Sequence, residues 1–273
     1  MFRLMVLGLA VVLLAGFTRA EPPPVKCRVT AKLVSTEYEK AGGKVEGAIS
    51  TVTGPSGPMS PKRAKNDEVS IELPPGTYSI QFSGNGSRGA TFEPVKKKVV
   101  IEDGVTKLDL GTVDMPASTT TRLFGKPVPE FEKIAEWKNT DALTMKRLRG
   151  KVVVLEFWSH TCSICLSHKP DVVKLVDRYK DEKVSVLTVH QNTADTIDDV
   201  EGRLPERVKK AAMSLPIALD SKGPKSICRS LGIGAVPAVL LADTEGKIVR
   251  RFHTVSDPEL DKEIQTLLDA PKK

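Results

Sequence analysis

The run Val152-Val-Val-Leu-Glu-Phe-Trp158-Ser-His-Thr-Cys162-Ser-Ile-Cys165 decides how the second half of the chain folds. As far as Trp158 it is almost continuously apolar, which is typical of a strand buried on both faces of a sheet. A helical pattern of apolar residues follows from Cys162 to about residue 179. The sequence therefore predicts that Cys162 lies where a buried strand passes into a helix, with Cys165 one turn further along.

Strands and helices continue to alternate after this unit, which indicates an α/β domain with a mixed sheet. Ser256-Asp-Pro-Glu259 predicts a capping box, with Ser256 as the N-cap of a last helix. The other predicted elements are a buried strand at 184–189, a helix around 204–213, a short segment at 216–219, a helix near 227–231, and strands at 238–242 and 248–252 joined by the turn Asp243-Thr-Glu-Gly246.

Residues 25–113 show short strands separated by turn residues and no helical period. Apolar and polar residues alternate at 69–73 and 78–82, and Pro74-Pro-Gly-Thr77 between them predicts a β-hairpin. Two further strands are expected at 99–101 and 108–113. Several short strands at this spacing predict an all-β sandwich.

The N-terminus resembles a secretory signal peptide, with Arg3, an apolar stretch and the small residue Ala20. That stretch is short for a transmembrane helix, which needs about 20 apolar residues. An uncleaved anchor or a buried helix remains an alternative. The expected organisation is a signal peptide at 1–20, a β-sandwich domain at 21–113, a linker at 114–122 and an α/β domain at 123–273. The expected signal peptide predicts that the protein is exported, to the periplasm or another place outside the cytoplasm.

The composition excludes several classes of protein. The 273 residues include 41 Lys+Arg and 34 Asp+Glu, a net charge of +7, and 40% are apolar. Collagen-like, coiled-coil and disordered chains need other compositions, and only one segment approaches a membrane span. The excess positive charge is spread along the chain, which favours a solvated surface over a nucleic-acid interface. A membrane partner is expected only if the N-terminal segment is retained.

The two cysteines three residues apart carry the predicted chemistry. A helix N-terminus offers free N–H groups and partial positive charge, so the Cys162 thiol is expected to have a lowered pKa. Cys162 would attack a substrate disulfide, and the more buried Cys165 would resolve the mixed disulfide. No cofactor beyond the redox-active disulfide Cys162–Cys165 is expected.

Other uses of this pair fit less well. A c-type haem site needs His after the second Cys, but position 166 is Leu. A zinc or copper site using Cys162, Cys165 and His168 lacks a fourth ligand, so no metal is predicted. A purely structural disulfide closing so short a loop would add little stability.

Residues 123–270 resemble the thioredoxin fold, and more closely the exported thiol-disulfide oxidoreductases of the TlpA/ResA type. Besides the dithiol, Pro170 matches the proline of the active-site helix. The remaining matching segments are Phe124-Gly-Lys-Pro-Val-Pro-Glu-Phe131, Leu148-Arg-Gly-Lys-Val-Val-Val-Leu-Glu-Phe-Trp158 and Leu231-Gly-Ile-Gly-Ala-Val-Pro237. In the first half, Leu73-Pro-Pro-Gly-Thr-Tyr-Ser-Ile80 resembles the hairpin of transthyretin-like or carboxypeptidase-regulatory-like sandwiches.

The resemblance implies a cis-Pro237 opposite the dithiol and a Val236 backbone that docks the substrate. Glu156 falls where thioredoxins carry a buried acid that transfers the proton of Cys165; a strand-end Glu reaching solvent is the alternative. The implied function is disulfide exchange with protein thiols or disulfides, supported by an extracytoplasmic redox partner, in cell redox homeostasis.

The chain departs from the family at Thr161, where a Trp is usual, and at His168, where Glu is frequent. His160 would favour the Cys162 thiolate if protonated, or lie exposed in a loop. Cys228 is expected to be buried, and a bridge to Cys27 stays open. The alternative functions are a peroxiredoxin, a binding or scaffold protein and a metallochaperone, but the chain lacks the Pro-x-x-x-Thr-x-x-Cys arrangement of peroxiredoxins.

Overall fold

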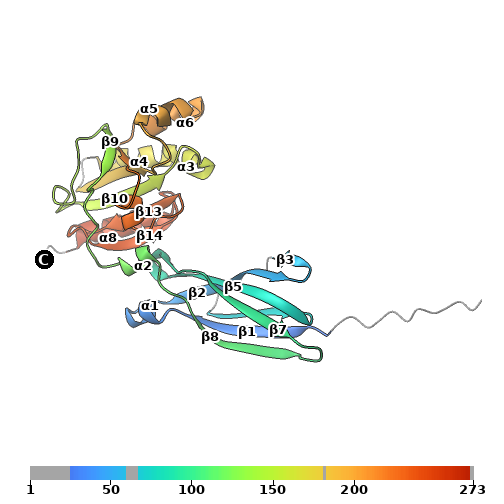
Figure 1. Cartoon of the computed structure of the whole chain (residues 1–273). Helices are drawn as coiled ribbons and strands as arrows, with labels where there is room; N and C mark the ends of the chain where they lie inside the picture. The colour runs from blue at the N-terminus through green and yellow to red at the C-terminus, as the bar shows by residue number, and fades with distance from the viewer. Residues whose placement is uncertain (1–24, 60–66, 181–182, 271–273) are drawn as a thin grey trace, which may run out of the picture.

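The computed structural model describes residues 25–59, 67–180 and 183–270, so the expected signal peptide lies outside the described residues. An all-β half comes first along the chain and an α/β half follows it (Figure 1). No helix within those described ranges is long and apolar enough to cross a membrane.

Two sheets enclose one hydrophobic core in the all-β half. Leu33, Ile80 and Phe82 are fully buried in that core, Leu33 from one sheet and the other two from its partner. The first sheet has the order β4-β1-β8, and the second has β3-β2-β5-β6 with β7 also paired to β5. The strands are β1 Cys27–Val34, β2 Val45–Gly54, β3 Gly57–Met59, β4 Glu68–Leu73, β5 Gly76–Gly86, β6 Ala90–Thr91, β7 Val95–Ile101 and β8 Lys107–Asp114, with a short helix α1 Thr36–Lys40 and a 3-10 turn Ser87–Gly89.

The predicted hairpin at 69–82 is wrong, although both of its strands exist. β4 pairs with β1, whereas β5 pairs with β2 and β7, so the two strands lie in different sheets. Pro74 and Pro75 have no N–H to continue a ladder, and the chain crosses between the sheets there. The apolar side chains of the two strands therefore meet across the shared core rather than side by side.

The α/β half is built on a mixed sheet of six strands in the order β14-β13-β10-β11-β12-β9. β10 is parallel to β11 and antiparallel to β13. Every residue of β10 is buried, as predicted. The strands are β9 Ile134–Lys138, β10 Val152–Trp158, β11 Val184–His190, β12 Ile217–Asp220, β13 Ala238–Ala242 and β14 Ile248–Phe252.

Helices lie against this sheet, and alternate residues of β10 enter separate cores on its two faces (Figure 1). Val154 and Trp158 pack with apolar residues of α4, α6 and α8, whereas Val153 and Leu155 pack with residues of α7. The helices are α3 Ser163–Ser167, α4 Lys169–Tyr179, α5 Ile197–Arg203, α6 Glu206–Met213, α7 Ile227–Ser230 and α8 Pro258–Asp269. This arrangement confirms the α/β thioredoxin fold, with an all-β sandwich preceding it.

Four details of the second half differ from the sequence-based expectations. The single helix expected from Cys162 is divided at His168, because Pro170 lacks an N–H and its ring crowds the carbonyl four residues earlier. α5 and the edge strand β9 were not predicted. The N-cap of α8 is Asp257 rather than Ser256, whose hydroxyl instead donates to Asp171, 2.8 Å away.

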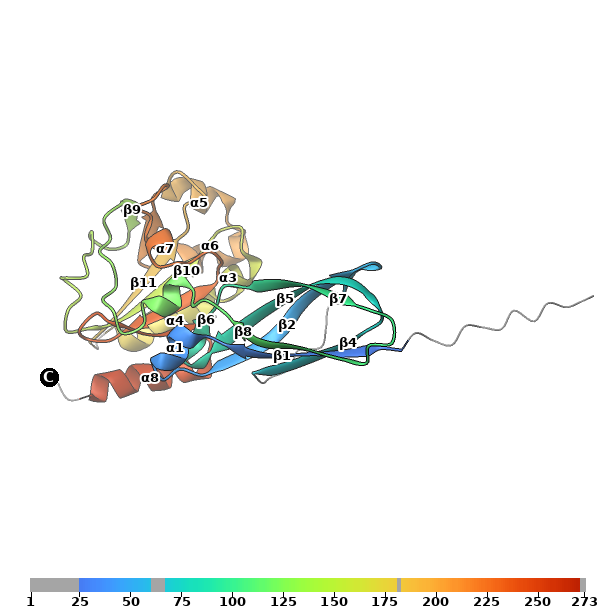
Figure 2. The same ribbon diagram turned by 60° about the horizontal axis from the view of Figure 1, so that its bottom comes forward.

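The segment expected as a linker contains α2, Thr119–Arg122, and joins the two halves closely. The Thr120 hydroxyl donates to the Leu231 carbonyl at 2.6 Å, and the Thr121 hydroxyl donates to the Thr91 carbonyl at 2.8 Å. A Cβ on Gly89 would lie 1.8 Å from the Arg251 carbonyl oxygen, so only glycine allows this approach. In Figure 2 the sandwich extends away from the α/β half, with α1 and β6 at its near end.

Candidate active site

Cys162 and Cys165 form a disulfide at the end of β10, with their Cα atoms 5.2 Å apart. Cys162 is the N-cap of α3, and Cys165 lies in its first turn. Cys162 is partly exposed, whereas Cys165 is 0% exposed. Solvent and a substrate therefore reach Cys162 alone. Ile164, between the two cysteines in the sequence, is 51% exposed and places an apolar side chain on the surface next to the dithiol.

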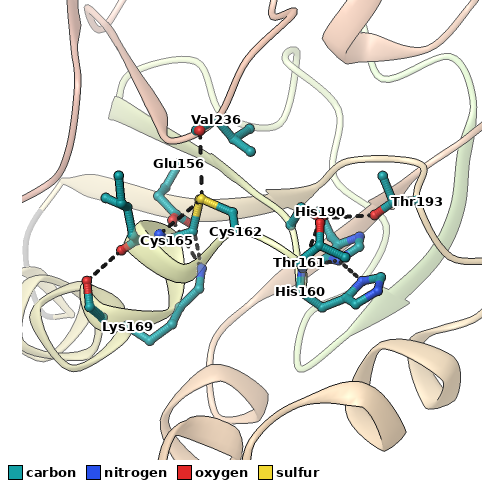
Figure 3. Close-up of a disulfide and its surroundings, with 12 residues drawn as sticks. Glu156, His160, Thr161, Cys162, Cys165, Lys169, His190, Thr193 and Val236 are labelled. Atoms are coloured by element: carbon teal, nitrogen blue, oxygen red, sulfur yellow. Dashed lines mark hydrogen bonds and ion pairs between the residues drawn. A yellow bond between two sulfur atoms is a disulfide. The ribbon is translucent and has the colours of Figure 1, made fainter.

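Two backbone groups contact the Cys162 sulfur (Figure 3). The Cys165 N–H donates to Sγ at 3.1 Å, and the Val236 carbonyl oxygen lies 3.7 Å from the same atom. The Val236–Pro237 peptide bond is cis, as the resemblance implies. An amide N–H directed at Sγ stabilises a thiolate in the reduced protein, because it donates to the charged form.

A buried ion pair lies beneath the dithiol. Glu156 from β10 is 3% exposed, and Lys169 from the first turn of α4 is 0% exposed. The Lys169 Nζ donates to both Glu156 oxygens, at 3.1 and 2.8 Å, and lies 3.7 Å from the centroid of the Trp158 ring. Glu156 is therefore a buried acid rather than a strand-end residue reaching solvent. Lys169 was not identified from the sequence, although its place four residues after Cys165 faces it toward the sheet.

Burial shifts the pKa values of both members of this pair. Desolvation raises the pKa of Glu156, and the nearby Lys169 ammonium opposes that rise. Desolvation also lowers the pKa of Lys169 to about 8, against the attraction of Glu156. Both charged forms are thus costly here, and titratable groups with pKa values shifted by burial and a charged partner are common at functional sites.

Two histidines stack beside the dithiol. The rings of His160 and His190 are 5.3 Å apart and nearly parallel, with His160 Nδ1 3.2 Å from His190 Nε2. The backbone N–H of His160 also donates to His190 Nε2 at 3.0 Å, and the rings of Trp158 and His190 pack edge to face. His160 is therefore buried, not exposed in a loop. His190, at the end of the strand beside β10, was not identified from the sequence.

Both imidazoles are held neutral. Burial, and then the proximity of His160, lowers the pKa of His190 to about 3. Burial, and then Arg203, lowers the pKa of His160. The thiolate of Cys162 consequently receives no stabilising charge from His160 or His190 near pH 7, whereas the Cys165 N–H does contact its sulfur.

Comparison with known proteins covers the part of the chain that contains this site. Residues 124–251 match the AhpC/TSA family. The second half of the chain is a thioredoxin-like redoxin of the TlpA/ResA type.

The relatives of this redoxin domain include thiol-disulfide oxidoreductases. Thiol-disulfide oxidoreductase ResA of Bacillus cereus is 29% identical over 47% of this chain and 68% of its own length. Protein SUPPRESSOR OF QUENCHING 1, chloroplastic, of Arabidopsis thaliana is 33% identical over 51% of this chain, but the match covers only 13% of the plant protein. A solved thiol-disulfide isomerase from Corynebacterium glutamicum covers 53% of this chain and 98% of its own, with 26% identity and a TM-score of 0.43.

The other candidate residues of the redoxin domain lie outside the dithiol site. His168 Nδ1 is 2.9 Å from the Ser256 hydroxyl and 3.6 Å from Asp171 Oδ2, so it does not replace a carboxylate at the sulfur. Cys228 and Cys27 are free and buried in different halves, which excludes a bridge between them here. Within the described ranges, no three His, Cys, Asp or Glu side chains are placed to hold a metal ion.

The neutral histidine pair leads to a spectroscopic prediction. Because the pKa of His190 is about 3, its ring resonances are expected to stay constant between pH 5 and 8 in two-dimensional NMR spectra. A titration of His190 near pH 6.5 would show that the pair carries charge and would overturn its assignment as a neutral pair.

Proposed function

We propose that this protein is an exported thiol-disulfide oxidoreductase that exchanges disulfides with protein substrates through Cys162 and Cys165. The observation that carries the proposal is the disulfide between a partly exposed Cys162 and a fully buried Cys165, facing a cis-proline loop. The redox family assignment supports it. The apolar N-terminal segment, outside the described residues, and the likeness to ResA support export and an extracytoplasmic redox partner.

The proposed reaction transfers two electrons between dithiol and disulfide. The Cys162 thiolate attacks one sulfur of a substrate disulfide, forming a mixed disulfide and releasing the first substrate thiolate. Cys165 then loses its proton and attacks Cys162 Sγ, which closes the protein disulfide and releases the second substrate thiolate. The two released thiolates take up protons. A redox partner restores the dithiol, and oxidation of a substrate dithiol is the same sequence in reverse.

Glu156 is the proposed acceptor of the Cys165 proton. Its carboxylate is buried beside the dithiol, and a base acting on a buried thiol must itself be reachable without water. The Lys169 Nζ donates to both oxygens of this carboxylate. The Lys169 ammonium therefore favours the charged form of this base against the desolvation that raises its pKa.

The direct test is the reduction of insulin disulfides by the protein in the presence of dithiothreitol, together with the reduction potential in glutathione buffers. A potential of about −270 mV would indicate a reductant, and one of about −120 mV an oxidant. A protein that neither exchanges with glutathione nor accelerates insulin reduction would contradict the proposal.

A peroxidase is the second candidate, because the AhpC/TSA match covers the same residues. It would consume hydrogen peroxide, oxidising Cys162 to a sulfenic acid that Cys165 converts to the disulfide with loss of water. Loss of peroxide measured in the same preparations separates the two functions. Peroxide consumption without disulfide exchange would favour this candidate.

Removing Lys169 is expected to shift the pH dependence of the resolving step. In Lys169→Met no ammonium opposes the effect of desolvation, so the pKa of Glu156 rises further. Because Glu156 must be deprotonated to accept the proton, the acid limb of the pH–rate profile, where the resolving rate falls, moves to higher pH. Stopped-flow fluorescence of the mixed disulfide decay measures this rate. Glu156→Gln is expected to lower it at pH 7 by about 10²-fold and to abolish the limb. An unchanged limb in both variants would exclude Glu156 as the acceptor.

A further inference from the structure

Helix α2, which is hydrogen-bonded to the sandwich through Thr121 and Thr91, lies against the loop that carries the cis-proline. Thr120 donates to the Leu231 carbonyl, and a Cβ on Gly232 would lie 2.6 Å from the Thr119 Cβ. The close approach is possible only because this position lacks a side chain. Gly232 also has φ +68, a backbone conformation that favours glycine. The contact lies five residues before Pro237 along the same loop. The sandwich is therefore positioned relative to the dithiol by packing and not by a free tether.

An open groove of about 400 Å³ lies where the two halves meet. One wall is formed by Glu93 and Thr119 from the sandwich side. The opposite wall is formed by Gln191, Arg229 and the loop of Gly232 to Gly234 from the redoxin domain. The site already described contains no residue of the sandwich, so this groove adds a surface to which both halves contribute.

The groove begins close to the reactive sulfur. Gly234 lies two residues before Val236, whose carbonyl oxygen is 3.7 Å from Cys162 Sγ. Two residues span at most about 7 Å. On the other side, the Gln191 N–H donates to the Trp158 carbonyl at 2.8 Å, at the end of the strand that leads to Cys162. A polypeptide joined to Cys162 through its cysteine reaches the groove within a few residues.

The groove walls suit an extended polypeptide. Gly232 and Gly234 are exposed and present backbone groups without side chains, and Gln191 adds an amide. Glu93 is exposed, and its backbone N–H donates to the Pro116 carbonyl at 2.8 Å, which fixes the position of its main chain. Within the described residues, neither the Glu93 carboxylate nor the Arg229 guanidinium has an ion-pair partner. The two walls thus offer opposite charges to a bound chain.

We propose that this groove binds the extended segment next to the partner's reactive cysteine, and that the sandwich selects partners with a basic residue facing Glu93. The inference rests on the proposed function and assigns the sandwich a role in substrate recognition. Glu93 provides the contact from the sandwich, and Arg229 on the other wall disfavours segments that are uniformly basic.

The test uses the full chain and peptides with one cysteine in a mixed disulfide with mercaptoethanol. Each peptide carries one lysine, placed between two and five residues from the cysteine on either side, and is compared with the same peptide bearing glutamate there. In Glu93→Lys, kcat/KM for the best lysine peptide is expected to fall about three- to tenfold, and that for its glutamate counterpart to rise. Raising the salt concentration should reduce the difference.

Two controls separate this inference from the proposed function. Hydroxyethyl disulfide is too small to reach the groove, so its kcat/KM should be unchanged in Glu93→Lys. Glu102→Lys makes the same charge change at an exposed position of the sandwich that does not line the groove, and should leave the lysine-to-glutamate preference unchanged. Equal effects of Glu93→Lys on both peptides, or no effect, would overturn the groove proposal. Absence of wild-type turnover of hydroxyethyl disulfide would instead contradict the dithiol function.

Discussion

Replacing Cys162 by serine is expected to lower insulin disulfide reduction by more than about 10³-fold. Cys162 is the only sulfur of the pair that solvent reaches, since Cys165 is 0% exposed. A serine hydroxyl at this position remains protonated near pH 7 and cannot form a disulfide, so both the attack and the closing step are lost. The rate of insulin precipitation with dithiothreitol, corrected for the uncatalysed rate, measures the loss.

Cys165→Ser should behave differently, because it leaves the attacking sulfur in place. The mixed disulfide between Cys162 and the substrate then has no internal thiol to resolve it, and it should accumulate as a covalent complex visible by intact mass spectrometry. Cys228→Ser is the matched control, since Cys228 is a buried free thiol in the same domain. Comparable activity losses in Cys162→Ser and Cys228→Ser, or no trapped complex in Cys165→Ser, would refute the assigned roles.

Breaking the buried ion pair is expected to have the largest effect on stability. Lys169→Met leaves the Glu156 carboxylate buried without its partner, which should lower the free energy of unfolding by about 3–5 kcal/mol. Replacing both residues, as Lys169→Met with Glu156→Leu, removes both buried charges and should restore most of that loss or exceed the wild type. Urea unfolding followed by tryptophan fluorescence measures it, because both tryptophans, Trp137 and Trp158, lie in the redoxin domain.

The pKa shifts predict how this comparison changes with pH. The pKa of Lys169 is lowered from 10.5 to about 8, so the unfolded chain binds more protons between these values and the contribution of Lys169 to stability rises with pH there. The pKa of Glu156 is raised from 4.5, so its contribution is complete below 4.5 and is lost as pH rises through the raised value. The free energy of unfolding of the double variant, taken relative to that of the wild type, should therefore decrease as pH rises from 8 to 10.5 and as pH falls toward 4.5.

A double variant no more stable than Lys169→Met would show that the ion pair itself contributes net stability. The expected recovery would instead mean that the pair is retained for chemistry, because two buried charges that cost stability need another reason to persist. Disulfide exchange by the recovered double variant then separates the two roles: a stable protein with a slow resolving step is the expected result.

Local patterns were sufficient to predict the elements closest to the dithiol. The apolar run at β10 and the helical period after Cys162 lie within a few residues of each other, so their structure follows from burial and backbone preference. The cis bond before Pro237 came from the resemblance and is present. The hairpin at 69–82 failed, because alternation identifies a strand but does not identify its partner.

The strand, the helix start and the places of the two cysteines could be predicted because each depends on neighbours along the chain. The contacts across the site could not, because they depend on how distant segments pack. Glu156 meets Lys169 because the division of the helix at His168 places α4 beneath the sheet, and His160 meets His190 because β10 and β11 pair in register. Likewise, Glu93 comes to line a groove near Cys162 because α2 packs the sandwich against the cis-proline loop. Such contacts arise from packing between distant segments, and no local pattern encodes which segments will meet.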